Sequence, residues 1–114
     1  MTDTNRLHRI ADLLRAIEQE MRRIGLWEAT APSPASLAST LPFCHDTLEF
    51  TQWLQWIFLA RMRALLESGA ALPTACDIHP LAEHSFLELP QDTARLLELI
   101  GEIDRAISAR TEGC

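Results

Sequence analysis

The chain has 114 residues and a formal net charge of −6, with ten basic and sixteen acidic side chains. This length fits one domain and is sufficient to bury a hydrophobic core. Hydrophobic residues make up 47% and charged residues 23% of the chain, a balance that excludes intrinsic disorder. Val and Tyr, two strong strand formers, are absent, whereas the abundant Leu, Ala, Glu and Arg favour helix. We therefore expect one all-α domain over residues 1–114.

The start of the chain and its cysteines predict a cytoplasmic protein without a membrane partner. No apolar stretch follows the first charged residues, so we expect no secretory signal. The longest apolar run, residues 56–60, is too short to cross a bilayer. Cys44, Cys76 and Cys114 form an odd and scattered set, which favours reduced thiols over a disulfide framework.

Apolar residues recur at spacings of three and four near the start of the chain and predict a helix over residues 5–24. Thr4 is the expected N-cap. Gly25 is expected to end the helix in a left-handed conformation, with Leu26 folding back on Met21. The opposite face carries three pairs of opposite charge: Asp12 with Arg15, Glu18 with Arg22, and Glu20 with Arg23.

Residues 29–44 carry no charge and are rich in Pro, Ser, Ala and Thr. Ser33 as a cap and Pro34 at the first helical position predict one short helical turn over residues 35–39. Neither side of this segment holds enough chain for a second domain. We therefore interpret it as a connection within the domain.

A second long helix is predicted over residues 48–68. Asp46 and Glu49 have capping-box spacing before it, and Gly69 is the expected stop. Its apolar residues cover most of the helical circumference. This pattern indicates a buried helix in the middle of the bundle, contacted by the first and last helices.

Two further helices complete the predicted fold. Pro80 can start a short helix over residues 80–87, which ends before Pro90. The last long helix is predicted over residues 91–110, with an apolar stripe formed by Leu96, Ile100, Ile103 and Ile107. No strand pattern is visible. The sequence therefore predicts an all-α bundle of three long helices and one short helix.

Several short motifs together resemble the YqcC family of small bacterial proteins. They are P-F-C-H-D-T at Pro42–Thr47, W-L-Q-W at Trp53–Trp56, Arg61-Met62, Leu72-Pro73 and Pro80. The resemblance runs from the first helix to Phe86 and is weakest in the last helix. Two positions depart from the family pattern, because Ala60 replaces a usual proline and Leu81 replaces a common aromatic residue.

The resemblance implies an all-α bundle and no established activity. Genes of this family are often found beside the gene for tRNA pseudouridine synthase C. Pseudouridine synthases resemble one another in a large mixed α/β domain with an essential aspartate, and this chain is too short and too poor in strand formers to build one. We therefore do not expect it to be a pseudouridine synthase by itself.

The candidate interaction residues surround the start of the second long helix: Pro42, Phe43, Asp46, Thr47, Trp53, Gln55, Trp56 and Arg61. Trp53 and Trp56 can both belong to the core, or one indole can line a groove for a partner. Asp46 or Thr47 can cap the helix while Phe43 packs against it. The same helix N-terminus can instead bind an anion.

Other kinds of site receive less support from the sequence. Structural zinc needs two closely spaced ligand pairs, and neither candidate cluster supplies them: Cys76 and His79 with Glu83 or His84, and Cys44-His45-Asp46. Adjacent side chains on an extended segment point apart, so the latter run is not a catalytic triad. We expect no catalytic residue, no metal and no cofactor.

The charge distribution disfavours direct binding to nucleic acid. Residues 1–25 carry five Arg against four acidic residues, whereas residues 26–114 carry five Arg against twelve. A net negative chain repels phosphate, and the expected ion pairs neutralise much of the basic strip on the first helix.

We predict a small cytoplasmic accessory protein that binds another protein. A tRNA-modifying enzyme is the candidate partner, by analogy from gene order. The alternative is a small-molecule-binding or enzymatic module with a pocket near residues 42–56.

Overall fold

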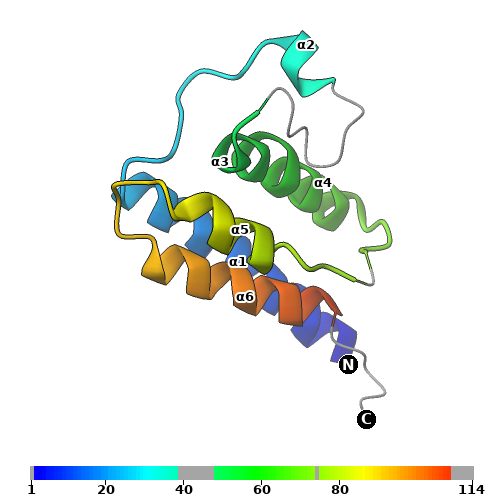
Figure 1. Ribbon diagram of the computed structural model, residues 1–114. Helices are drawn as coiled ribbons and strands as arrows, with labels where there is room; N and C mark the ends of the chain where they lie inside the picture. The colour runs from blue at the N-terminus through cyan, green and yellow to red at the C-terminus, as the bar shows by residue number, and fades with distance from the viewer. Residues whose placement is uncertain (1, 39–47, 74, 109–114) are drawn as a thin grey trace.

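The computed structural model describes residues 2–38, 48–73 and 75–108, and every regular element within these ranges is helical (Figure 1). The elements are α1 (Thr2–Arg23), α2 (Pro34–Leu37), α3 (Phe50–Trp53), the π-helical η2 (Leu54–Leu59), α4 (Ala60–Ser68), α5 (His79–Phe86) and α6 (Ala94–Ser108). The segments α3, η2 and α4 follow one another without a break and form one rod, which we call the central rod. The predicted all-α fold, with three long helices and one short one, is confirmed.

The C-terminal end of α1 forms as predicted. Gly25 adopts a φ of 82°, and the backbone N–H of Leu26 donates to the carbonyl of Met21 at 2.8 Å. This is the Schellman arrangement that the sequence indicated. The prediction for the other end is wrong, because α1 already begins before Thr4, which is therefore not its N-cap. An apolar stripe marks the buried part of a helix, and a polar first turn can extend it through backbone hydrogen bonds alone.

The central rod begins two residues later than predicted. Glu49 is its N-cap, and Glu49 and Gln52 form the capping box, with the backbone N–H of Glu49 donating to Oε1 of Gln52 at 2.9 Å. Leu48 is buried but precedes the helix. Asp46, the other predicted member of a capping box, lies outside the described residues. Gly69 ends the rod with a φ of 72°, as predicted.

The short turn in the uncharged segment is also confirmed. Pro34 starts α2, and Oγ of Ser33 accepts the backbone N–H of Ser36 at 3.1 Å. None of the residues of α2 is buried, and the turn stands away from the other helices (Figure 1).

The helices α1 and α6 lie antiparallel and make the most extensive contact between described elements (Figure 1). At one end of this pair, Nε of Arg6 donates to the carbonyl of Ala106 at 3.0 Å, and Nη2 donates to that of Ile107. A cation is favourable at the C-terminal end of a helix dipole. The side of α6 that faces the core carries the predicted stripe of Leu96, Ile100, Ile103 and Ile107, all fully buried.

The central rod has a less enclosed position than predicted. It contacts α1 through α4 and α5 through α3, while α6 packs mainly on α1 and α5. Leu54, Leu59 and Met62 reach the core, whereas Trp56 and Ile57 are only half-buried and Ala60 is exposed. The helix that lies between two long partners is therefore α1. The apolar side chains of the rod therefore face α1 and α5 on some sides and remain partly exposed on another.

A buried carboxylate joins the short helix to the last one. Oδ1 of Asp104 accepts the backbone N–H of Ile78 at 3.0 Å, and Oδ2 accepts that of His79 at 2.8 Å. Sγ of Cys76 lies 3.0 Å from Oδ1 of the same group. Asp104, on α6, thus satisfies the free N–H groups at the start of α5, a role usually taken by a residue of the same segment. Helix α5 begins at His79, one residue before the predicted start at Pro80, which lies in its first turn.

Within residues 2–38, 48–73 and 75–108, no helix combines the length and the apolar content required to cross a bilayer.

We expect the substitution Asp104→Asn to lower the free energy of unfolding by about 1–3 kcal/mol, because the amide offers one acceptor atom where two backbone donors are buried. Urea unfolding would measure the loss. The matched control is Asp92→Asn, since exposed Asp92 accepts one N–H, that of Ala94, at 3.1 Å. Asn replaces Asp at such a position at a cost of less than about 0.5 kcal/mol. Equal losses in both variants would contradict the role assigned to Asp104.

Candidate interaction groove

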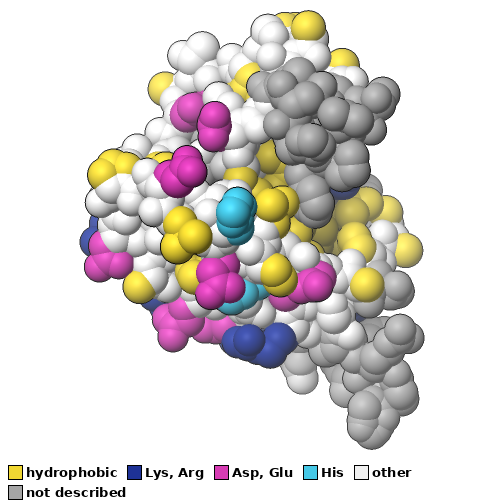
Figure 2. Space-filling view, in the orientation of Figure 1, with side chains coloured by type: hydrophobic (Ala, Val, Ile, Leu, Met, Phe, Trp, Pro, Cys, Tyr) yellow, Lys and Arg dark blue, Asp and Glu magenta, His cyan; other side chains and the backbone are white. Residues whose placement is uncertain are grey.

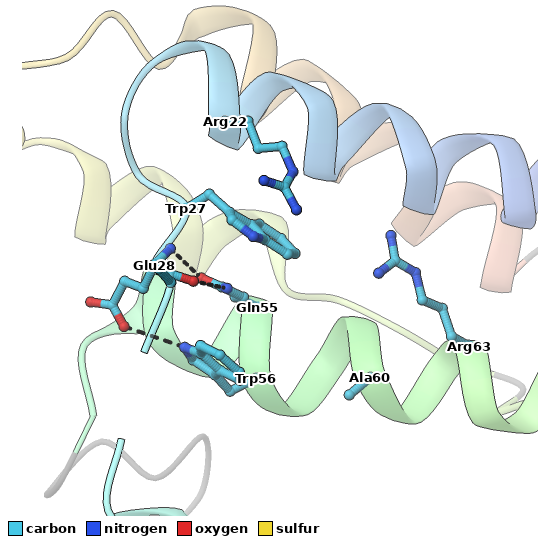
Figure 3. Close-up of a pocket in the computed structure, with 8 residues that line it drawn as sticks. Arg22, Trp27, Glu28, Gln55, Trp56, Ala60 and Arg63 are labelled. Carbon is cyan, nitrogen blue, oxygen red and sulfur yellow. Dashed lines mark hydrogen bonds between the residues drawn. The ribbon is translucent and has the colours of Figure 1, made fainter. Parts of the chain in front are cut away.

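An open pocket of about 650 Å³ lies between the end of α1, the segment that follows it, and the central rod (Figure 3). Side chains from all three parts converge on it. Its lining residues are Arg22, Trp27, Glu28, Ala29, Gln55, Trp56, Ala60 and Arg63. We call this pocket the tryptophan pocket.

Gln55 fixes the floor of the tryptophan pocket. The side chain is buried, and its Oε1 accepts the backbone N–H of Glu28 at 2.9 Å. Its Nε2 donates to the backbone carbonyl of the same residue at 2.8 Å. A side-chain amide with one donor and one acceptor can pair in this way with one backbone residue. Gln55 therefore holds the segment after α1 against the rod.

The carboxylate of Glu28 orients one wall of the pocket. Nε1 of Trp56 donates to Oε1 of Glu28 at 3.3 Å, and Nε2 of Gln52 lies 3.3 Å from Oε2. The indole N–H is thereby satisfied by the protein, while the half-buried ring lines the pocket (Figure 3). An indole held in one orientation needs little further ordering to receive an apolar group.

A second indole lies on the α1 side of the pocket. Trp27 is half-buried and packs against the core, and the guanidinium of Arg22 lies 4.8 Å from its ring centroid. This cation–π contact favours one position of the Arg22 side chain across the ring. The pocket is thus bounded by two tryptophans and by charged groups of both helices (Figure 3).

Glu18 of α1 binds two arginines at the edge of the pocket. Nε of Arg22 lies 2.9 Å from Oε2 of Glu18, and Nη2 of Arg63 contacts Oε1. Burial raises the pKa of Glu18, but the hydrogen bonds and charges of Arg63 and Arg22 outweigh it and hold the pKa below its ordinary value of 4.5. The three groups, which we call the arginine triad, carry a net charge of +1.

A second hollow of about 470 Å³ lies on the other side of the arginine triad, between α1 and α4. Arg63 lines both hollows. The lining residues of the second hollow are Ala11, Leu14, Arg15, Glu18, Arg63, Leu66 and Glu67. We call the two hollows together the α1–α4 groove.

The structure separates the residues that the sequence placed in one candidate site. Gln55 and Trp56 line the tryptophan pocket, whereas Trp53 packs against the rings of Phe50 and Phe58, with centroids 5.7 and 5.6 Å away. Arg61 is exposed and lies outside the pocket lining. The remaining four candidates lie outside the described residues: Pro42, Phe43, Asp46 and Thr47.

Sequence reasoning missed most of the pocket walls. It identified Glu18 and Arg22 as an ion pair, and that pair is confirmed, as are Asp12 with Arg15 and Glu20 with Arg23. It did not identify Trp27, Glu28 or Arg63, which come from distant segments. The helical spacing of Glu18 and Arg22 was the one local signal.

The Cys76 thiol is half-buried and lies beside the carboxylate of Asp104. Burial, and then the hydrogen bond to Asp104, raise the pKa of the Cys76 thiol, so the neutral form is favoured. In the described part of the chain, no three His, Cys, Asp or Glu residues are placed to hold a metal ion.

We expect the substitution Gln55→Ala to lower the free energy of unfolding by about 1–3 kcal/mol, because the backbone N–H and C=O of Glu28 lose their partners. It should also change the intrinsic fluorescence, since Trp27 and Trp56 flank the released segment. Gln19→Ala, on the exposed face of α1, is the control and should change stability by less than about 0.5 kcal/mol. Unchanged stability and fluorescence in the Gln55→Ala variant would contradict the role of Gln55 in holding the segment after α1 against the rod.

The arginine triad predicts a pH dependence. Because the pKa of Glu18 is lower in the fold than in the unfolded chain, its carboxylate stabilises the protein above pH 4.5, and this contribution is lost as the pH falls through the folded-state pKa. The difference in unfolding free energy between the protein and its Glu18→Gln variant should therefore be largest near neutral pH and shrink in acid. Glu98→Gln removes an exposed ion pair with Arg95 and should have a small effect throughout. A pH-independent difference for Glu18→Gln would exclude this linkage.

Comparison with known proteins agrees with this fold. The family model DUF446, described as tRNA pseudouridine synthase C, matches residues 9–106. An uncharacterized protein of Haemophilus influenzae is 37% identical over 87 residues, which are 76% of this chain and 82% of that protein. The uncharacterized protein YqcC of Escherichia coli is also 37% identical, over 75% of this chain and 80% of that protein.

A relative of another size carries an enzyme name. A protein of Pectobacterium carotovorum subsp. carotovorum, named tRNA pseudouridine synthase C, is 41% identical over 69 residues. These residues are 60% of this chain but 18% of that protein, so the similar region is a small part of a much longer polypeptide.

A solved structure extends the similarity to three dimensions. The solution NMR structure of protein YqcC from E. coli matches with a TM-score of 0.78 and 31% identity, covering 90% of this chain and 88% of that one. With most of its length matched by the family model and by relatives of its own size, the chain belongs to the YqcC-like DUF446 family.

Proposed function

We propose that this protein is an accessory module that binds another protein and acts with a tRNA pseudouridine synthase. The observation that carries the proposal is the α1–α4 groove, in which an oriented indole and two arginines stand at an open surface. Trp and Arg are the residues most often found at the energetic centre of protein interfaces.

The distribution of charged groups supports binding over catalysis. Asp104 is fully engaged by backbone donors, and the Cys76 thiol is held in its neutral form, so neither group is presented to a substrate. The polar groups at the groove already bind one another. Such an arrangement suits recognition of a second molecule and offers no activated nucleophile.

The choice of partner comes from the comparisons. The family model bears the description tRNA pseudouridine synthase C, and one relative with that name contains a similar region within a much longer chain. Two regions that are joined in one polypeptide commonly act in the same process. The synthase encoded by the same organism is therefore the partner that we propose.

The proposal is tested with the purified protein and the purified synthase C of the same organism. We expect a complex by calorimetry and gel filtration at moderate salt. The variant Trp56→Ala should weaken it by about tenfold or more, because the indole is removed from the groove. Leu87→Ala is the control, since that side chain is 76% exposed on another part of the surface. Circular dichroism would verify that both variants fold, and the absence of a complex at any salt concentration would reject the proposed partner.

A second candidate function is the binding of a small molecule in the tryptophan pocket. Its volume of about 650 Å³ lies within the range of known ligand sites, roughly 300–1,000 Å³. The pocket is open, however, and a ligand of that size would remain accessible to solvent. A thermal-shift screen distinguishes the two functions, because a stabilising metabolite that loses its effect in the Trp56→Ala variant would favour this second one.

A further inference from the structure

The α1–α4 groove has a regular construction. As residue numbers rise along α1 from Ala11 to Arg22, the facing residues of the rod fall from Glu67 to Gln55, so the two walls are antiparallel helices. Eleven residues of helix span about 16 Å, or three turns. The groove is therefore about as long as three turns of a helix, the element that binds in helix-in-groove complexes.

The charges along the groove follow a simple order. The arginine triad, with a net charge of +1, lies at the centre, because its member Arg63 lines both hollows. Glu28 lies at one end of the groove, and Glu67 lies at the other with Arg15, whose charge is balanced by its ion pair with Asp12. An occupant that matches this order carries a negative group at its middle and none at its ends.

The arginines can bind such a group without leaving Glu18. Each guanidinium has five N–H donors, and one atom of Arg22 and one of Arg63 are used by Glu18. The side chains of Arg22 and Arg63 are 57% and 39% exposed, whereas Glu18 is 22% exposed. Glu18 therefore lies beneath the two guanidiniums and positions them at the surface.

Apolar surface flanks the triad on both sides. The tryptophan pocket offers Trp27 and Trp56, and the second hollow offers half-buried Leu66 and Ala11, because Leu14 is 1% exposed and belongs to the core. Along the rod, Leu66 lies about one helical turn from Arg63, and Trp56 lies about two turns from it. Apolar residues at positions i and i+11 of an occupying helix, with a carboxylate at i+7, would reach the two hollows and the triad from one face.

We propose that the α1–α4 groove binds an amphipathic helix of a partner protein, with two apolar anchors that bracket one Asp or Glu. This inference deepens the proposed function and rests on it for the partner. The charge order favours a protein helix over RNA, because a run of phosphates would meet Glu28 and Glu67 in the groove. Acidic side chains also lie on the separate α5–α6 face, which a longer nucleic acid would have to avoid (Figure 2).

The test uses the full chain and two alanine-rich synthetic peptides of about 15 residues, a length at which helices begin to form in water. Both carry Leu at i and i+11, and they differ only in having Glu or Lys at i+7. Because neither peptide contains Trp, the fluorescence of the protein reports binding near Trp27 and Trp56. We expect the Glu peptide to bind about tenfold more tightly than the Lys peptide.

Charge exchange provides the decisive comparison. In the Arg63→Glu variant the preference should reverse toward the Lys peptide, which a merely unfolded variant cannot show. Arg95→Glu is the matched control, since this arginine also binds a glutamate, Glu98, but on the exposed face of α6. It should keep the preference of the unaltered protein. Arg63→Gln, which adds no charge beside Glu18, should abolish the preference without reversing it.

Several results would overturn the inference. They are failure of both peptides to bind, equal binding of the two, or no effect of Arg63→Glu. Self-association through the groove, seen by sedimentation and lost in Arg63→Glu, would assign it to a second copy. Displacement of the Glu peptide by a single-stranded RNA oligonucleotide would assign it to RNA. If the Glu peptide binds as expected but the synthase does not, the proposal that the groove binds an acidic amphipathic helix is kept. The synthase is then rejected as the partner.

Discussion

The carboxylate of Glu18 connects α1 to the central rod on the open side of the bundle. It binds Arg22 within its own helix and Arg63 on the central rod, so it joins two helices that otherwise touch over a small area. The opposite side of α1 packs along α6 and is anchored at its end by Arg6. Because α1 is held firmly on that side, the α1–α4 groove can remain open without loss of the core.

The relatives establish the family of this chain and no activity for it. Relatives of similar length are uncharacterized, and the relative with an enzyme name contains the similar region as 18% of its length. Within the described ranges, the buried carboxylate of Asp104 and the thiol of Cys76 hold α5 against α6. The side chains at the groove are instead oriented by Gln55 and Glu28, which gives this surface a fixed arrangement.

Much of the fold could be predicted because its determinants are local. A stripe of apolar residues, a glycine after the last turn, and a serine–proline pair each act within a few residues, and α1, α2 and α6 follow them. Errors fell at helix starts, where Thr4 and Leu48 were placed by spacing alone. Several residue pairs near a helix start satisfy the same spacing rule. The capping box that forms uses Gln52, which also reaches the carboxylate of Glu28 across the fold.

The sequence by itself determined the all-α class, the apolar stripes of the first and last long helices, and the family, because periodicity and motifs are properties of neighbouring residues. Tertiary structure alone decided the groove. Trp27, Gln55 and Arg63 are far apart along the chain and meet because Gln55 pairs with the backbone of residue 28 and Glu18 binds Arg63. Trp53 and Trp56 share one helical motif, yet one packs on phenylalanines and the other lines the pocket. Which face of a helix stays open depends on where its neighbours end, and no local pattern records that.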